Sequence, residues 1–213
     1  MNKTLLITRP KHDPTVHYLF YWAKKIIELA RAKSITVIDL RGKRANHEEV
    51  ISILQKKQPS LVFFNGHGND GCILGYNDEV LVAVGKSENV LVSKIVYALS
   101  CRSGKELGPK SIQNGALGYI GYDDDFIFVR DENKMSEPLK DKTAGLFLEP
   151  SNQVMVCLLK GHPIKYSHEQ SKKKFRENMR QVANSESQES YLIRYLFWDM
   201  QHQVCLGDRN VSL

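Results

Sequence analysis

Apolar and polar positions along the chain follow two kinds of pattern. Short, almost continuous apolar runs at residues 4–8, 35–40 and 61–64 have the length of buried strands. Between these runs, apolar residues recur every three or four positions at residues 16–31, and again up to about residue 57, as on one face of a helix. This β-α-β-α-β order predicts a parallel sheet with right-handed crossovers.

The rest of the chain continues the α/β pattern and adds helices at its end. Turn signals around short apolar runs at residues 69–85 predict a hairpin or an irregular excursion. We expect strands at 95–99 and 116–121, and helices at 87–93, 105–114, 138–161 (one or two helices broken at Pro150), 167–183 and 188–205. Without a Gly-, Ser- or Pro-rich linker, residues 1–213 are predicted to form one α/β domain, a three-layer sandwich with a mostly parallel central sheet and extra C-terminal helices.

Two helix starts carry capping signals. Asp13 before Pro14 is the pattern of an N-cap followed by proline at the first helical position. Asn46 with Glu49 resembles a capping box that opens the next helix.

Two of the predicted strands end in residues that can carry chemistry. The run I-V-Y-A-L at residues 95–99 breaks into S-C-R-S-G, which places Cys101 at the carboxyl end of a strand. The run L-V-F-F-N-G-H-G at residues 61–68 places His67 in the same position. Since ligands collect outside the carboxyl ends of strands in open α/β sheets, we expect the thiol and the imidazole to be neighbours. A histidine beside a thiol can take its proton and leave the nucleophilic thiolate.

The surrounding residues fit an acyl-transfer site. Ser103 and Gly104 are expected to begin the helix after Cys101, whose dipole would lower the thiol pKa further. Gly68 has no side chain, so its N–H can face a substrate carbonyl. A lone strand-end cysteine is more often a small buried hydrophobe, and a lone histidine near glycine a loop residue. The two motifs in consecutive βα units together favour the catalytic interpretation.

These motifs resemble those of a known group of enzymes. Residues 65–68 (Asn-Gly-His-Gly) and 100–104 (Ser-Cys-Arg-Ser-Gly) are similar to the His-Gly and Cys motifs of the caspase-like (clan CD) cysteine peptidases, which include caspases, metacaspases, legumains, gingipains, separases and CHAT domains. The end of the chain, from residue 206, resembles the close of gingipain-type and CHAT-type domains, with Arg209 where that group often has proline. Leu99 and Ser100 replace the Gln-Ala of the caspase signature, so gingipain-like or CHAT-like domains are the better comparison.

The resemblance implies a caspase-hemoglobinase-like fold and a cysteine endopeptidase. Cys101 would be the nucleophile and His67 the general base and acid, with the N–H groups of Gly68 and Cys101 as the oxyanion hole. The substrate would be a protein or peptide, and a regulatory protein partner is compatible with the group. The chemistry needs no metal or other cofactor, although calcium dependence occurs among relatives. The alternative is a latent or non-catalytic caspase-like scaffold that serves as an interaction module.

Acidic residues at the strand ends are candidates for the S1 pocket, which holds the residue before the scissile bond (P1). Asp13 occupies a place similar to the S1 acid of arginine-specific gingipains, although the helix N-cap explains this residue equally well. Asp123, Asp124 and Asp125 follow the strand expected at residues 116–121 and form a second candidate, unless they are simply solvated. Arg9 would favour an acidic P1 instead. Because the acids outnumber this arginine, we favour a basic P1 residue, arginine or lysine.

Composition adds limits to this hypothesis. Four cysteines lie far apart without CxxC pairs, which suggests neither a disulfide framework nor a zinc knuckle, and we expect a soluble, cytoplasmic protein without a membrane partner. The formal charge of +6 comes mostly from seven Lys and Arg at residues 160–180, without interleaved aromatics, so nucleic acid is not the expected partner. A nucleotide-binding domain is disfavoured, because Arg9-Pro10 and no Gly-rich loop follows the first strand.

Overall fold

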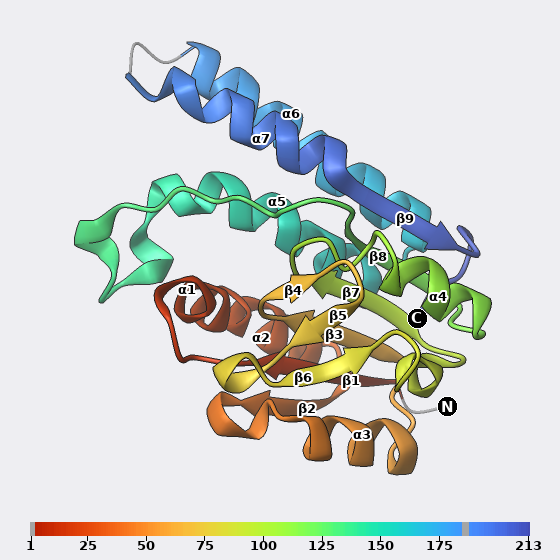
Figure 1. The fold of residues 1–213 in the computed structure, drawn as a ribbon. Helices are drawn as coiled ribbons and strands as arrows, with labels where there is room; N and C mark the ends of the chain where they lie inside the picture. The colour runs from red at the N-terminus through yellow and green to blue at the C-terminus, as the bar shows by residue number, and fades with distance from the viewer. Residues whose placement is uncertain (1–2, 185–187) are drawn as a thin grey trace.

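The molecule is built on a six-stranded sheet. We describe it from a computed structural model that defines residues 3–184 and 188–213. In sheet order the strands are β2 (Thr36–Arg41), β1 (Thr4–Arg9), β3 (Leu61–Asn65), β7 (Ile95–Leu99), β8 (Gly118–Tyr122) and β9 (Gln203–Gly207) (Figure 1). All neighbours are parallel except β8 and β9. The carboxyl ends of β1, β3, β7 and β8 therefore share one edge of the sheet.

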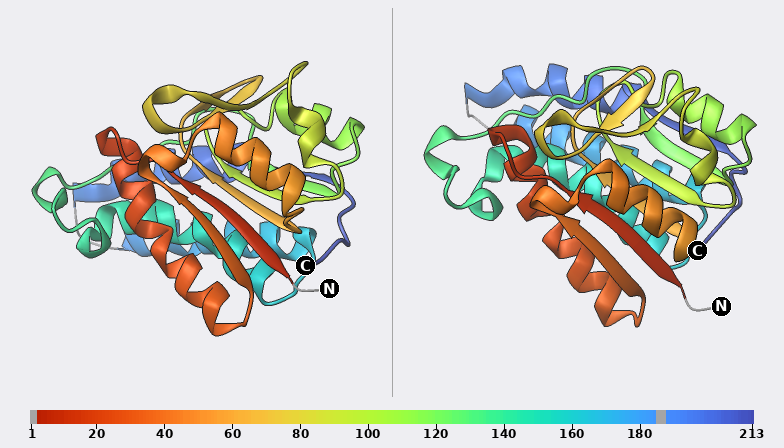
Figure 2. Two further views of the ribbon diagram at one scale, coloured as in Figure 1. Left: turned by 90° about the horizontal axis from the view of Figure 1, so that it is seen from below. Right: turned by 60° about the horizontal axis from the view of Figure 1, so that its bottom comes forward.

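Helices cover both faces of this sheet. One face packs against α1 (Pro14–Trp22), α2 (Lys24–Ala32) and α5 (Lys142–Leu159), and the other against α3 (His47–Lys56) and α4 (Leu107–Gln113). Figure 2 shows α3 and the pair α1–α2 on opposite sides of the strands. The helices α6 (Ile164–Asn184) and α7 (Leu192–His202) form a hairpin that packs on α5 through a separate apolar cluster. This arrangement confirms the predicted α/β sandwich with extra C-terminal helices.

The strands form because their side chains are apolar on both faces. In β3, Leu61 and Phe63 point to the core under α1, α2 and α5, while Val62 and Phe64 point to the core under α3 and α4. All five residues of β3 and all five of β7 are buried. Such double-sided burial is characteristic of parallel strands covered by helices, and it is why continuous apolar runs marked these strands in the sequence.

The predicted excursion after His67 is a small antiparallel sheet. Its strands are β4 (Gly68–Asn69), β5 (Cys72–Leu74) and β6 (Val80–Ala83), in that order. Ile73 and Leu81 are buried in the same core cluster as Val50 of α3, so the small sheet lies on the α3 side of the molecule. Short 3₁₀ helices complete the chain, at η1 (Gly42–Arg44), η2 (Tyr76–Asp78), η3 (Glu88–Leu91), η4 (Glu132–Lys134), η5 (Pro138–Lys140) and η6 (Gln188–Tyr191).

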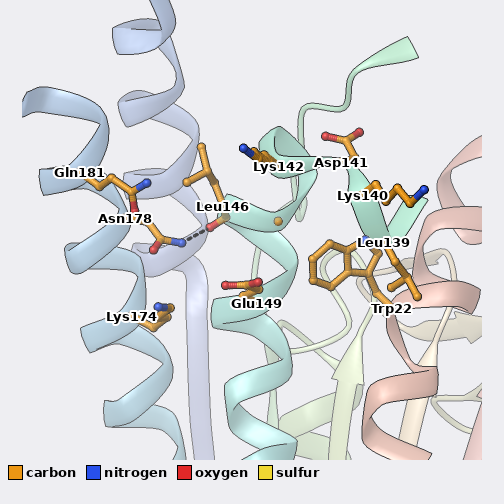
Figure 3. A pocket seen from close by; sticks show the side chains of 11 residues that line it. Trp22, Leu139, Lys140, Asp141, Lys142, Leu146, Glu149, Lys174, Asn178 and Gln181 are labelled. Atoms are coloured by element: carbon orange, nitrogen blue, oxygen red, sulfur yellow. Dashed lines mark hydrogen bonds between the residues drawn. The ribbon is translucent and has the colours of Figure 1, made fainter. Parts of the chain in front are cut away.

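The predicted break at Pro150 is wrong, because α5 runs through this proline without interruption. A proline has no N–H, so the carbonyl of Leu146 one turn earlier loses its helical donor. Asn178 of α6 replaces it, with Nδ2 donating to the Leu146 oxygen at 2.7 Å (Figure 3). The carbonyl of Pro150 accepts a hydrogen bond from Ser171 Oγ at 2.8 Å. Side chains of α6 therefore supply hydrogen-bond donors to carbonyl groups of α5 around Pro150.

Two other predicted helices differ from the structure. The segment 16–31 is divided at Ala23 into α1 and α2. The segment 188–205 is helical only up to His202, after which Gln203–Gly207 forms β9 against the edge of β8. Residues 203–207 become a strand because they pair with the open edge of β8, and the local sequence does not show that this edge is available.

Among the described helices, none combines the length and the hydropathy needed to cross a membrane.

Candidate active site

The ends of β3 and β7 bring the His-Gly and Ser-Cys segments together. The two strands pair in parallel with Asn65 opposite Leu99, so His67 and Cys101 each stand two residues beyond the last pair. Ser100 Oγ donates a hydrogen bond to the carbonyl of His67 at 2.7 Å. A Cβ built at Gly68 would lie 2.9 Å from the carbonyl oxygen of Cys101. The two segments are thus in direct contact, as the strand-end argument predicts.

Asp13 links His67 to the end of β1. Its Oδ2 lies 2.7 Å from His67 Nε2, while its Oδ1 accepts the N–H groups of Thr15 at 2.7 Å and Val16 at 3.1 Å. The second contact confirms the predicted N-cap of α1. Burial alone would raise the pKa of Asp13, but the hydrogen bonds from His67, Val16 and Thr15 outweigh it and lower the pKa. The carboxylate therefore stays ionised and fixes the orientation of the imidazole.

The Cys101 thiol is half-buried and protonated in this state. Its Sγ donates to the carbonyl of Phe126 at a distance of 3.8 Å. Burial raises the pKa of the thiol, and the nearby carboxylate of Asp125 acts in the same direction. Within the described residues, no hydrogen bond joins the side chains of His67 and Cys101. The structure shows a resting thiol and an imidazole anchored by Asp13 on two adjoining segments.

The expected helix dipole does not act on Cys101. Residues 101–106 form turns, and α4 begins only at Leu107, so the prediction that Ser103 and Gly104 open the helix is wrong. Gly104 donates its N–H to the carbonyl of Tyr122 at 2.7 Å, which holds this segment against the end of β8 in place of a helical turn.

The backbone around Cys101 offers a donor to a ligand. Among the residues that the structure describes, none accepts a hydrogen bond from the Cys101 N–H. At Gly68, a Cβ would lie 2.2 Å from Ser100 Oγ, so only glycine allows β4 to approach this closely. The oxyanion-hole assignment to Gly68 and Cys101 stays a prediction that this geometry allows.

The three aspartates after β8 have different partners. Asp123 Oδ1 is 2.8 Å from His202 Nδ1 of α7, and Asp125 Oδ1 is 3.0 Å from Arg102 Nε. Asp124 has no cationic side chain within salt-bridge distance in the described part of the chain. Its carbonyl accepts the N–H of Arg102 at 3.0 Å, so the loop lies directly beside the residue that follows Cys101.

Arg9, the candidate that would favour an acidic P1, is a structural residue. Its side chain is only 4% exposed, with Nε donating to Asp39 Oδ1 at 2.9 Å and Nη1 donating to the carbonyl of Phe20 at 2.9 Å. The guanidinium also lies over the Phe20 ring. All of these contacts are internal, so Arg9 ties β1 to β2 and α1.

Two polar side chains that the sequence patterns did not single out, those of His12 and Asp78, belong to the same cluster as His67. His12 Nε2 lies 3.3 Å from Oδ2 of Asp13 and 3.3 Å from Oδ1 of Asp78. One ligand atom each from His12, His67 and Asp78 falls within 4.8 Å of the others, so these residues could hold a metal ion. His12 was detectable, because it follows β1 as His67 follows β3. Asp78 was not, because it belongs to the hairpin insertion and only the fold brings it here.

The hollow shown in Figure 3 is separate from this site. It has a volume of about 240 Å³ and lies between α5, α6 and the ring of Trp22, with Glu149 and Lys174 at its wall. None of the candidate catalytic or S1 residues is among the described residues that line it.

Comparisons with known proteins bear on the fold. No protein-family model and no curated protein sequence matches the chain. Among solved structures, it is similar to the Arg specific cysteine proteinase gingipain R (RgpB), with a TM-score of 0.64, and to the complex of the pro- and mature domains of Porphyromonas gingivalis RgpB, with a TM-score of 0.63. A third structure, described only as a protease, has a TM-score of 0.50.

The fold is the caspase-hemoglobinase-like fold of the gingipains. The whole chain is covered in each case, at 9%, 9% and 13% identity, and it spans 48% of each neighbour. The predicted resemblance to clan CD peptidases is therefore confirmed as a likeness of fold. The chain spans about half the length of these neighbours.

Proposed function

We propose that this chain is a cysteine endopeptidase domain in which Cys101 is the nucleophile and His67 the general base. The observation that carries the proposal is the contact between the two strand-end segments, with the His67 imidazole anchored by Asp13 at 2.7 Å. The likeness in fold to gingipain R, which is described as a cysteine proteinase, supports it. A peptide or protein is the substrate class.

The chemistry proceeds through an acyl-enzyme. His67 accepts the proton of the Cys101 thiol, and the thiolate attacks the scissile carbonyl to form a C–S bond. The N–H groups of Cys101 and Gly68 stabilise the developing oxyanion. His67 returns the proton to the leaving amine as the C–N bond breaks, and then activates a water that hydrolyses the thioester. Asp13 stabilises the imidazolium during both proton transfers, because its carboxylate stays ionised.

The state of the thiol favours a second candidate, a latent domain. The thiol donates to the Phe126 carbonyl and its pKa is raised by burial, so the structure holds Cys101 away from its reactive form. Activity then requires the Sγ atom to leave the Phe126 carbonyl. Binding of a substrate or a regulatory partner that moves the loop after β8 supplies this change.

A basic P1 residue suits the charges near the thiol. The two carboxylate oxygens of Asp13 already contact His67 and the first turn of α1. Asp123 is paired with His202, and Asp125 is paired with Arg102. Asp124 Oδ1 accepts only the N–H of Asp125 at 2.7 Å and has no cationic partner in the described part of the chain, so we assign Asp124 the S1 role. Gingipain R, one of the proteins of similar fold, is described as Arg specific, which supports the same choice.

Peptide hydrolysis with substrates varied at P1 tests this function. The wild-type chain is compared with Cys101→Ala, His67→Ala and the matched control Cys205→Ala, whose thiol is also half-buried but lies on β9. The proposal expects activity to be lost in the first two variants and kept in the third, with cleavage after Arg or Lys. Activity that survives in Cys101→Ala would overturn the mechanism.

Absence of hydrolysis by the wild type, with Cys101 still open to slow alkylation, would support the latent domain. The same assay with calcium and a reductant present covers the calcium dependence that occurs among clan CD relatives.

A further inference from the structure

Two imidazoles and two carboxylates converge on one side of the candidate base. His12 Nε2 is 3.3 Å from Asp78 Oδ1, and the Oδ2 atom of Asp13 lies 3.3 Å from His12 Nε2 and 2.7 Å from His67 Nε2. Ligand atoms of His12, His67 and Asp78 all fall within 4.8 Å of one another. Outside this cluster, the described part of the chain has no group of three such side chains this close.

The fold holds these side chains in place from three separate segments. His12 follows β1, His67 follows β3 and Asp78 ends η2 in the hairpin insertion. The ring of His12 is only 11% exposed and packs edge-on against the rings of Tyr76 and His67. Asp78 is 58% exposed and has a left-handed backbone with φ of 58°, so it closes the cluster from the solvent side. An ion therefore has access from solvent to a largely preformed set of ligands.

The donor atoms fit a transition metal better than calcium or magnesium. Two imidazole nitrogens with a carboxylate oxygen are ligands that Zn²⁺ accepts, whereas Ca²⁺ and Mg²⁺ prefer oxygen alone. In a tetrahedral site with bonds of about 2.0–2.1 Å, two ligand atoms are roughly 3.3 Å apart. The separation between His12 Nε2 and Asp78 Oδ1 already has this value, and the other separations within the group are at most 4.8 Å.

We propose that His12, His67 and Asp78, with Asp13 available as a fourth ligand, form a binding site for Zn²⁺ or a similar divalent transition metal. On a neutral ring the metal binds Nε2 and the single ring proton moves to Nδ1, whereas a ring protonated on both nitrogens releases one proton to solvent. The effect of this metal on catalysis depends on the proposed peptidase function. With Nε2 of His67 bound to metal, the one ring proton stands on Nδ1, so His67 no longer accepts the Cys101 proton and the metal inhibits the peptidase.

Metal titration of the full chain tests the site without any need for activity. The EDTA-treated protein, kept reduced with a phosphine, is titrated with Co²⁺ by visible absorption and with Zn²⁺ by calorimetry. The variants are His12→Gln, Asp78→Asn and Cys101→Ala, with circular dichroism to verify folding. His202→Ala is the matched control, because His202 also pairs with an aspartate, Asp123 at 2.8 Å, but this pair has no third ligand among the described residues.

The proposal expects one metal per chain in the wild type, Cys101→Ala and His202→Ala. It expects at least about tenfold weaker binding in His12→Gln and Asp78→Asn. Binding that disappears in Cys101→Ala but persists in Asp78→Asn would place the metal on the thiol and overturn the site, as would the absence of binding by the wild type.

Inhibition is measured separately and bears on the second half of the proposal. If the wild type hydrolyses peptides, Zn²⁺ inhibits it, and Asp78→Asn raises the inhibitory concentration at least about tenfold relative to the variant's own uninhibited rate. If the chain hydrolyses no peptide, the metal titration still decides the site. Failure of the proposed function and failure of the metal site are thereby distinguished.

Discussion

Asp13 serves two neighbours with its two carboxylate oxygens. Oδ1 caps α1 and Oδ2 contacts His67. A substitution that keeps the cap but loses the contact with His67 should therefore change activity without changing the free energy of unfolding. Serine is as good an N-cap as aspartate but is too short and uncharged to hold the imidazole. We expect Asp13→Ser to keep the stability of the domain within about 0.5 kcal/mol and to lower kcat by about 10²-fold or more.

Asp13→Ala is the companion variant. It removes the cap as well and is expected to cost about 1 kcal/mol of unfolding free energy in urea denaturation, with a loss of kcat similar to that of Asp13→Ser. Full activity in the serine variant would mean that the contact between Asp13 and His67 has no part in catalysis.

The raised pKa of the Cys101 thiol makes its reactivity depend on pH in a defined direction. Because burial raises this pKa above its ordinary value, the thiolate fraction keeps increasing in alkaline solution. We expect the rate of alkylation of Cys101 by iodoacetamide, followed by mass spectrometry of its peptide, to rise between pH 7 and about pH 9.5 without a plateau.

Cys205 provides an internal reference in the same experiment. Burial raises the pKa of this thiol to about 11, so its alkylation should be slower than that of Cys101 at every pH. A rate at Cys101 that is already constant below pH 7 would reveal a thiolate–imidazolium pair and contradict the resting state described above.

At the scale of elements, the approach of β4 to the Cys101 segment depends on glycine. A Cβ at Gly68 would meet Ser100 Oγ at 2.2 Å and the Cys101 carbonyl at 2.9 Å, and the second atom belongs to the backbone and cannot turn aside. We expect Gly68→Ala to separate the two segments and to reduce peptidase activity at least about 10²-fold, since misplacement of catalytic groups by about 1 Å has this effect.

Gly71 in the neighbouring turn is the control for this substitution. Its nearest neighbour to an added Cβ is Glu106 Oε2 at 3.6 Å, an ordinary contact. Gly71→Ala should therefore keep both activity and melting temperature close to those of the wild type. If Gly68→Ala and Gly71→Ala changed activity and melting temperature equally, the close contact at Gly68 would not be the cause of the effect.

The sequence was informative where an element is decided locally or by burial on both faces. The apolar runs of β1, β3 and β7 predicted the sheet, and their carboxyl ends predicted that the segments of His67 and Cys101 would be in contact. Three features depended on distant partners instead. These are the donor that Asn178 supplies to α5, the pairing of β9 with β8, and the position of Asp78 beside His12.

The start of α4 illustrates the same limit inside the candidate site. Small polar residues after Cys101 are typical of a helix start, yet the bond from the Gly104 N–H to the Tyr122 carbonyl holds them as turns. A pattern at the end of a strand therefore located the candidate residues but did not determine the electrostatic field around the thiol.

At the scale of the whole molecule, the C-terminal hairpin is coupled to the loop that contacts the thiol. Asp199 of α7 is fully buried, and its Oδ1 accepts the N–H of Ile127 at 2.9 Å, next to the Phe126 carbonyl that receives the Cys101 thiol. Trp198 Nε1 donates to the carbonyl of Asp125 at 2.9 Å. Residues far apart in the sequence thus fix the loop after β8, and changes in α7 can reach the candidate site.

Burial gives Asp199 a pKa well above its ordinary value, so the folded protein keeps a proton that the unfolded chain releases. Below about pH 4 both states hold this proton, and Asp199→Asn, which mimics the neutral carboxyl, should be about as stable as the wild type. As the pH rises, the wild type loses up to about 1.4 kcal/mol of unfolding free energy per pH unit relative to the variant, until the folded carboxyl ionises.

Urea unfolding of both proteins between pH 5 and pH 8 measures this difference, and a gap that widens with pH identifies Asp199 as a buried neutral acid. A constant gap would mean that the folded carboxyl ionises near its ordinary pKa. Since Asp199→Asn leaves the oxygen that accepts from Ile127, the loop after β8 should keep its place in this variant. The slow alkylation of Cys101 should therefore persist in it while the pH dependence of stability disappears.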